Sequence, residues 1–314
     1  MKVIELTELL GKTKQAYYKR IKVIEQQSYN EDLVVGLVLG KRTTWKKGSG
    51  RNLHASLKEE FKKHNIKIGR DKFFDLLRSN GLLMIRKQRK VRTTLSYHHF
   101  HKYPNLIKDI LVDRPNQVIV SDITYLWIED VENFAYLFLI TDMYSRKTIG
   151  YFLSEDMKTK SGLEALKMAV KNMKVRSGCI HHSDRGVQYC SEQYTNYLKK
   201  NKMLISMTES GDPLENPIAE RLNGILKGEF TLQKQISFPS FSVAKKQISK
   251  IIDFYNNERP HRSIEMLTPS EAYNKEGVLK RKWKTYYQTD NIKLKVLKNI
   301  IEQNDMENIC SESY

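Results

Sequence analysis

From Asn116 onward, the pattern of apolar and polar residues is that of strands. Residues 118–127 (VIVSDITYLW) form two sets that alternate between the faces of an extended chain, which predicts one long strand. Residues 134–141 (FAYLFLIT) predict a second strand and residues 147–152 a third, separated by a turn at 142–146. Three successive strands joined by short turns indicate an antiparallel meander.

Beyond residue 160, helical and strand patterns alternate. Apolar residues recur every three or four positions where helices are predicted, and short apolar runs bounded by turn residues predict further strands. The predicted helices cover 161–173, 192–201, 217–230 and 243–257, and the predicted strands cover 179–183 and 204–207. A meander followed by alternating helices and strands indicates a mixed α/β sheet of five strands with helices on both faces.

The front of the chain has a helical pattern instead. Residues 5–20 predict two short helices around Gly11, and residues 57–80 predict two more around a turn at 65–69. Two short helices around a turn are the helix-turn-helix pattern, in which the second helix enters the major groove of DNA. An ordinary helical hairpin has the same pattern, so both interpretations stay open here.

The distribution of charge favours a nucleic-acid partner for this front segment. The chain has 54 Lys and Arg against 36 Asp and Glu, a net charge of +18. Residues 1–110 hold 25 of these basic residues against 10 acidic ones, whereas residues 111–314 hold 29 against 26. Concentrated positive charge indicates a polyanion, of which nucleic acid is the usual one, and a merely Lys-rich surface is the alternative.

Composition excludes several protein classes. With 40% hydrophobic residues the chain can bury a core, which excludes wholesale disorder. Its cysteines, Cys179, Cys190 and Cys310, cannot form a disulfide framework and lack the short paired spacing of a zinc knuckle. No run approaches the roughly 20 apolar residues of a membrane span, and the first residues lack the apolar run of a signal peptide. We therefore expect a soluble protein of a reducing, cytoplasmic compartment.

Three acidic residues occupy unusual positions in the rear segment. Asp122 lies inside an otherwise apolar strand, Asp184 follows the fourth strand, and Glu220 lies in the first turns of a helix. A carboxylate inside a strand is costly unless it has a partner, and divalent cations are partners that several carboxylates can share. Two such cations about 3.5–4 Å apart can activate an attacking oxygen and stabilise a leaving oxygen of a phosphodiester. The alternative is that these acids are ordinary turn or edge residues, and their spacing alone does not decide between the two interpretations.

The helix around Glu220 also carries a basic residue. Glu220, Asn223 and Lys227 fall on one face, whereas the apolar residues of this helix form the opposite stripe. If Glu220 holds a metal ion, Lys227 is placed to hold the phosphate beside it. A solvated helix face is the simpler alternative.

These residues lie in motifs that resemble a known family. The motifs are SDITY at 121–125, HSDRGVQY at 182–189 and NPIAE at 216–220, followed by Leu226 and Lys227. They are similar to the DDE transposases of bacterial insertion sequences, and in particular to the IS-three family, whose catalytic part is a retroviral-integrase-like core. Between Asp184 and Glu220 lie 35 residues, and Lys227 follows Glu220 by seven, as in the family.

Further motifs extend the resemblance over residues 116–273, and the basic front is similar to the family's helix-turn-helix region. These motifs are TDMYSR at 141–146, YNNERPH at 255–261 and TPSEAY at 268–273. The sequence departs from the family where Glu215, Asn216 and Pro217 stand in place of the frequent Asp-Asn-Ala. The zinc-binding module of retroviral integrases has no counterpart.

The resemblance implies a ribonuclease H-like core with a Mg²⁺- or Mn²⁺-dependent centre. Asp122, Asp184 and Glu220 would be the catalytic residues and would ligate two metal ions. The implied activity is that of a polynucleotidyl transferase and endonuclease: attack by water nicks the DNA strand at the element's end, and attack by a 3′-hydroxyl joins strands. No covalent protein intermediate is needed.

The resemblance also implies partners. DNA, as element ends and target, is the expected substrate, and the expected DNA contacts are Lys227, Asn223, Arg185 and Gln188. A structural role for His182 is as well supported as a DNA contact. Because two ends must be cut together, at least a homodimer on DNA is expected. Whether a separate upstream helix-turn-helix subunit takes part is left open.

The predicted domains are a basic helix-turn-helix DNA-binding region (1–95), a linker (96–111), the ribonuclease H-like catalytic core (112–275) and a basic C-terminal tail (276–314). Two other functions stay open: a DNA-binding regulator that uses only the basic front, and a ribonuclease H-like nuclease without strand transfer. The expected location is the bacterial cytoplasm, at the nucleoid.

Overall fold

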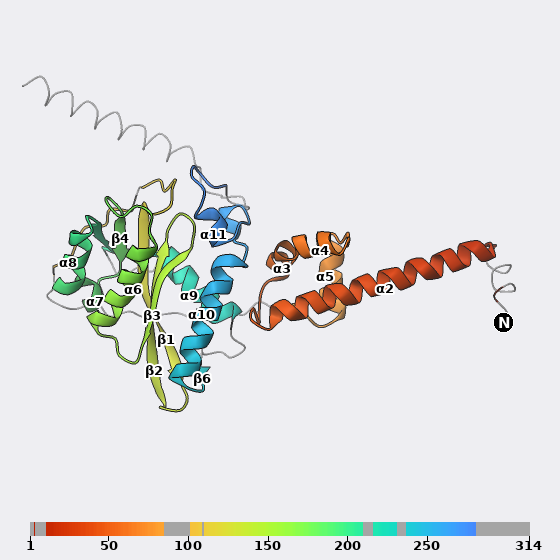
Figure 1. Cartoon of the computed structure of the whole chain (residues 1–314), viewed down its shortest axis with the longest axis horizontal. Helices are drawn as coiled ribbons and strands as arrows, with labels where there is room; N and C mark the ends of the chain where they lie inside the picture. Colours follow the sequence, from red (N-terminus) through yellow and green to blue (C-terminus); the bar gives the residue numbers. More distant parts are fainter. Residues whose placement is uncertain are drawn as a thin grey trace, which may run out of the picture. The chain divides into compact units, whose positions relative to one another are not determined.

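The chain forms two compact units (Figure 1). The first comprises Met1–Lys90 and Gly228–Lys234, and the second comprises Val91–Lys227 and Gln235–Tyr314. This computed structural model describes Val3 and residues 11–84, 101–108, 110–209, 216–230 and 237–280. The predicted helix before Gly11, the start of the predicted linker at residues 96–100, residues 210–215 and the tail beyond residue 280 lie outside the described residues.

The first unit is helical. Its helices are α2 (Lys14–Arg42), α3 (Gly50–Ser56), α4 (Lys58–Lys63) and α5 (Arg70–Ser79). The side chain of Thr13 caps α2 by accepting a hydrogen bond from Ala16 N. Trp45 is fully buried in the core of this unit, where its Nε1 donates to Glu229 Oε2 at 2.8 Å.

The two helices predicted around a turn over residues 57–80 are present as α4 and α5, with Asn65 in the left-handed conformation that the intervening turn needs. The prediction of a short helix ending near Arg20 is wrong, because residues 14–20 are the first two turns of α2, which runs for 29 residues. Residues 21–42 include no proline that would stop the helix.

The second unit is built on a mixed sheet. Its strands are β1 (Val118–Ile128), β2 (Asn133–Asp142), β3 (Thr148–Ser154), β4 (Ile180–Ser183), β5 (Leu204–Met207) and β6 (Ser237–Phe238), in the order β3-β2-β1-β4-β5 with β6 pairing β1. The first three strands pair antiparallel, and β4 and β5 continue the sheet in parallel. The predicted mixed α/β sheet is therefore confirmed, with one more strand than predicted, because a two-residue strand has no period to detect.

Helices cover both faces of this sheet, as predicted. They are α6 (Thr159–Asn172), α7 (Val187–Cys190), α8 (Glu192–Lys200), α9 (Pro217–Glu229), α10 (Phe241–Asn257) and α11 (Pro269–Ala272), with a short 3₁₀ helix at Arg262–Ile264. One core cluster joins Ile119 and Phe138 of the sheet to Ala165 and Tyr194, and another joins Val120 to Ala219 of α9. The two clusters use alternate residues of β1, as the pleat of a strand requires.

A glycine lets α6 approach the sheet closely. A Cβ atom on Gly150 of β3 would lie 2.3 Å from the carbonyl oxygen of Ala165 in α6. No side chain fits at that distance, so the packing of α6 against β3 depends on glycine at this position.

Two of the family-like motifs have structural roles in this unit. Asp142 is fully buried and accepts hydrogen bonds from Asn116 N, Ser145 N and Ser145 Oγ, which closes the turn after β2. Asn256 of α10 binds the backbone of Thr148 twice, accepting from its N–H at 3.0 Å and donating to its carbonyl at 2.9 Å. These contacts tie the edge strand β3 to α10.

Within the described ranges, no helix has both the length and the apolar composition needed to cross a membrane. Cys179 and Cys190 are buried and are not joined in a disulfide. Cys310 lies outside the described residues.

Candidate active site

Asp122 lies in the middle of β1, half-buried. Its Oδ1 accepts a hydrogen bond from Ile123 N at 2.9 Å, and its Oδ2 accepts one from Asn223 Nδ2 at 2.5 Å. The carboxylate inside the strand therefore has hydrogen-bonding partners, as a buried charge requires.

The pairing of β1 with β4 ends two positions before both Asp122 and Asp184. In the parallel pair of β1 and β4, Val120 is opposite His182. Asp122 and Asp184 each follow these residues by two positions, and neighbouring strands lie about 4.8 Å apart. Asp184 is also half-buried, and its Oδ1 accepts from Gly186 N at 3.0 Å. Asp184 thus directly follows β4, the strand that pairs with the strand of Asp122, although 62 positions separate the two acids in the numbering.

Glu220 is held against the same part of the sheet by two asparagines. Asn216 Nδ2 donates to Ser121 O at 3.1 Å, and Asn223 Nδ2 donates to Asp122 Oδ2. Glu220 comes four residues after the first asparagine and three before the second. Residues at these spacings share one side of a helix, so Glu220 is on the side of α9 that meets β1.

The other predicted site residues differ in their burial and in their hydrogen bonds. Lys227 is half-buried, one turn beyond Asn223 on α9. Asn223 itself is only 2% exposed. Gln188 Nε2 donates to the carbonyl of Met157 at 2.9 Å. Arg185, directly after Asp184, is half-buried.

His182 is fully buried, and its Nδ1 lies 2.9 Å from Ser206 Oγ. A side chain in this position cannot reach DNA without moving, so its contacts are those of a structural residue that links β4 to β5.

The donor chemistry of the three acids fits a hard divalent cation. Carboxylate oxygens are the ligands that Mg²⁺ and Mn²⁺ prefer, and the buried Oδ1 of Asn223 has no hydrogen-bond partner among the described residues. In the conformation described here, however, no three His, Cys, Asp or Glu side chains of the described ranges are gathered closely enough to hold a metal ion. In this conformation the three predicted ligands therefore do not form a coordination shell.

The sequence patterns did not predict a buried polar cluster that includes Ser121, the residue before Asp122. His181 Nε2 lies 2.7 Å from Ser121 Oγ and 2.9 Å from Tyr194 Oη. Burial lowers the pKa of His181 to about 3, so the ring is neutral. The ring of Tyr189 packs against His181 and Tyr194. The only sequence signal for this cluster is the position of Ser121, His181 and Tyr189 in or beside the two acidic motifs.

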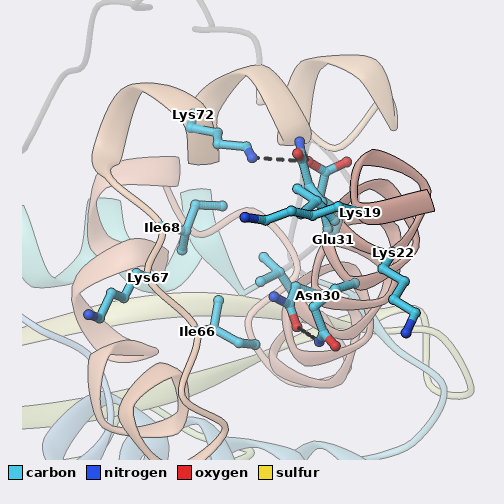
Figure 2. A pocket seen from close by; sticks show the side chains of 12 residues that line it. Lys19, Lys22, Asn30, Glu31, Ile66, Lys67, Ile68 and Lys72 are labelled. Atoms are coloured by element: carbon cyan, nitrogen blue, oxygen red, sulfur yellow. Dashed lines mark hydrogen bonds and ion pairs between the residues drawn. The ribbon is translucent and has the colours of Figure 1, made fainter. Parts of the chain in front are cut away.

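The first unit contains a basic groove (Figure 2). It has a volume of about 380 Å³ and lies between α2 and the segment that leads into α5. Lysines, carboxamides, apolar residues and one carboxylate line it: Lys19, Lys22, Lys67 and Lys72, with Gln26, Gln27, Asn30, Val23, Val34, Ile66, Ile68 and Glu31. Lys72 forms an ion pair with Glu31 at 3.3 Å. The groove is therefore positively charged overall.

Comparison with protein families agrees with the geometry of the second unit. A model of the integrase core domain matches residues 112–213, and a second integrase core model matches residues 201–269. Together these matches cover all three acids and the sheet that carries them.

Individual relatives give the family. The transposase for insertion sequence element IS629 from Shigella sonnei is 30% identical over 210 residues, which are 67% of this chain and 69% of that protein. The chain belongs to the DDE transposases of the IS-three family. The transposase InsF for insertion sequence IS3A from Escherichia coli strain K12 is 31% identical over 201 residues, or 63% of this chain and 68% of that protein.

This transposase is accordingly a polynucleotidyl transferase that cleaves DNA and transfers strands during transposition of an insertion sequence. Among solved structures, it is similar to the HTLV-2 integrase catalytic core domain in complex with magnesium. That likeness covers 51% of this chain and 98% of that chain, with 14% sequence identity and a TM-score of 0.38.

Proposed function

We propose that Asp122, Asp184 and Glu220 form the centre at which this transposase cuts and joins DNA. The observation that supports this most directly is the pair of contacts to β1 from Asn223 of α9 and from Asn216, the residue before α9, because Glu220 lies between these two residues in the sequence. The pairing of Val120 with His182 supports the inclusion of Asp184.

The same three carboxylates are the proposed ligands of two Mg²⁺ or Mn²⁺ ions. When bound, such ions lower the pKa of an attacking hydroxyl and neutralise charge on a leaving oxygen. The protein's own contribution is to orient the carboxylates: Asn223 holds one oxygen of Asp122, and Gly186 N holds one oxygen of Asp184. No protein nucleophile is required.

The test uses purified transposase, DNA that carries the element's end sequence, and Mg²⁺ or Mn²⁺. We expect Asp122→Asn, Asp184→Asn and Glu220→Gln to lose strand cleavage and joining, while DNA binding in a gel-shift assay stays at the wild-type level. Glu192→Gln is the matched control, because Glu192 is an exposed acid in the first turn of α8. Cleavage by Asp184→Asn at the control rate would remove Asp184 from the site.

The cleavage assay also separates the alternative functions. A regulator that acts only through DNA binding would show no metal-dependent cleavage, and Asp122→Asn would change nothing measurable. A nuclease without strand transfer would cleave the end but fail to join its 3′-hydroxyl to target DNA. Joined products that disappear in Asp122→Asn would exclude both.

Beside the acids, we propose that Lys227, Arg185 and Gln188 contact DNA. Lys227 is supported by its place one turn beyond Asn223 on the half-buried side of α9. Asn223, a predicted DNA contact, is better supported as the residue that orients Asp122, since its side chain is buried and engaged there.

We further propose that the first unit binds the element's ends. Its support is the pair of helices α4 and α5 around a turn, as in the predicted helix-turn-helix, together with the lysines of the groove. Because these lysines would contact phosphates, replacing Lys19, Lys22 and Lys67 by Gln should weaken DNA binding and reduce its dependence on salt. Unchanged affinity at low and high salt would exclude the groove as a DNA contact.

Two finer proposals concern the assembly and the location of the transposase. Cutting two ends together requires at least two copies on the DNA, with or without a separate upstream helix-turn-helix subunit. Size-exclusion chromatography of the DNA complex with light scattering measures the number of copies.

The second proposal concerns location. An enzyme whose substrate is bacterial DNA works in the cytoplasm, at the nucleoid, which is where we expect this transposase.

A further inference from the structure

Tyr189 carries a buried hydroxyl that has no hydrogen-bond partner in the described part of the chain. The residue lies in α7 and is only 2% exposed. Leaving a buried O–H unpaired costs about 1–3 kcal/mol, and such groups in native proteins call for an explanation. The neighbouring Tyr194 differs, because its hydroxyl is 2.9 Å from His181 Nε2.

Gly186 connects Tyr189 to Asp184. The N–H of this glycine donates to Asp184 Oδ1, and its carbonyl accepts from Tyr189 N, both at 3.0 Å. A Cβ atom placed on Gly186 would lie 3.0 Å from Asp184 Oδ1 and 3.5 Å from Tyr189 Cδ2. The carboxylate and the phenol ring therefore border the same small space.

Electrostatics agree with this location. Burial raises the pKa of Tyr189 well above its ordinary value, and the neighbouring Tyr194, Asp184 and Asp122 raise it further. The phenol thus keeps its proton at neutral pH and is a permanent hydrogen-bond donor within the electrostatic reach of two of the three acids.

The ring is held in place from its other side. It packs edge-on against Tyr194 with centroids 5.4 Å apart and tilts against His181 at 6.1 Å. His181 in turn contacts Ser121, the residue before Asp122. This packing places the ring inside the core, where its hydroxyl is shielded from solvent.

We propose that Tyr189 is a positioning residue of the catalytic centre, whose hydroxyl donates a hydrogen bond to the Asp184 carboxylate when the centre assembles on DNA. Gly186 N holds one oxygen of Asp184, and the phenol would orient the other. The inference rests on the proposed role of Asp184. It gives a function to Tyr189, the last residue of the motif at 182–189.

Tyr189→Phe tests this directly, because it removes the hydroxyl and keeps the ring. Removal of an unpaired buried hydroxyl alone is neutral or stabilising, so the melting temperature should be unchanged or higher. With a positioning role, we expect single-turnover cleavage of end DNA to slow about tenfold, the effect of losing one charge-assisted hydrogen bond. DNA binding should be unchanged.

A direct measurement of metal binding provides a second readout. Titration of the transposase–DNA complex with Mn²⁺, followed by electron paramagnetic resonance of the free ion, should show weaker binding to Tyr189→Phe than to the wild type. A merely structural hydroxyl would leave this affinity unchanged. Wild-type cleavage together with wild-type Mn²⁺ affinity would therefore overturn the proposal.

Tyr194→Phe is the matched control. It removes a partnered hydroxyl from the same cluster, so we expect lower thermal stability and no change in Mn²⁺ affinity. An equal loss of Mn²⁺ affinity in both variants would indicate general loosening of the core and would overturn the proposal. Asp184→Asn keeps the two hypotheses apart: cleavage by that variant refutes the proposed centre, whereas a normal Tyr189→Phe refutes only the role of Tyr189.

Discussion

Asn223 Nδ2 donates a hydrogen bond of 2.5 Å to Asp122 Oδ2, although 101 positions separate the two residues in the numbering. The contact joins the middle of β1 to the second turn of α9. Glu220 lies one turn earlier on that helix, so the bond sets the distance between two of the three acids. Its loss should affect catalysis before it affects the fold.

Asn223→Asp should reduce cleavage by more than about tenfold, because it replaces a donor by a second negative charge beside Asp122. Binding of end DNA should persist. Single-turnover cleavage and a gel shift measure the two effects. Gly224→Ala is the control, since a methyl group at this exposed position of α9 meets no atom within 4 Å. Equal rates for the two variants would contradict the role of the Asn223–Asp122 bond.

Lys227→Gln should weaken DNA binding in a salt-dependent way. If Lys227 contacts one phosphate, the slope of log affinity against log salt should fall in magnitude by about 0.9. Lys227→Arg keeps the charge and should restore most of the slope. Fluorescence anisotropy at several salt concentrations measures it. A slope for Lys227→Gln that equals the wild-type slope would remove Lys227 from the DNA interface.

Asn256→Ala should lower the stability of the second unit by about 2–5 kcal/mol. The substitution leaves the buried backbone N–H and carbonyl of Thr148 without the partners that they have at 3.0 and 2.9 Å. Urea unfolding followed by circular dichroism measures the change. Exposed Asn257, the next residue, makes its bonds at the surface, so Asn257→Ala should cost less than about 1 kcal/mol. Similar losses in both variants would argue against the role of Asn256.

His181 should make the transposase less stable in mild acid. Its folded pKa is lowered to about 3, whereas an unfolded histidine has a pKa of about 6.5. Only the unfolded chain therefore takes up this proton, so stability falls as the pH drops from about 6.5 toward 3. Between pH 6.5 and pH 5 the contribution is about 2 kcal/mol.

The comparison of wild type with His181→Gln isolates this effect from other titrating groups. Urea unfolding at pH 7 and pH 5 measures the free energy of unfolding of both proteins. The loss between these pH values should be smaller in the variant, because its unfolding no longer takes up the proton of His181. An identical loss in both proteins would mean that His181 titrates normally in the folded state.

Local sequence patterns predicted most elements of the second unit to within a few residues. β5 covers the predicted 204–207, and β1 extends one residue past the predicted end because Ile128 continues the pairing with β2. α10 begins at Phe241, two residues before the predicted start, because the side chain of Ser240 caps it. Such features depend on neighbours along the chain, which is why a single sequence contains them.

Some tertiary contacts could not be predicted from a local sequence pattern. Asn256 occupies a motif, but only its two bonds to Thr148 explain what the residue does. The burial of Asn223 also differs from the exposed position that a helix face with Glu220 and Lys227 suggested. In both cases the deciding partner belongs to a strand more than 100 positions away.

The sequence by itself determined the order of helices and strands, the concentration of positive charge in the front segment, and the spacing of the acidic motifs, because these are local or compositional properties. Only the tertiary structure decided which atoms meet: the level pairing of β1 with β4, the bond from Asn223 to Asp122, and the enclosure of Tyr189. Such contacts depend on strand register and on the packing of remote segments, and no period along the chain encodes either.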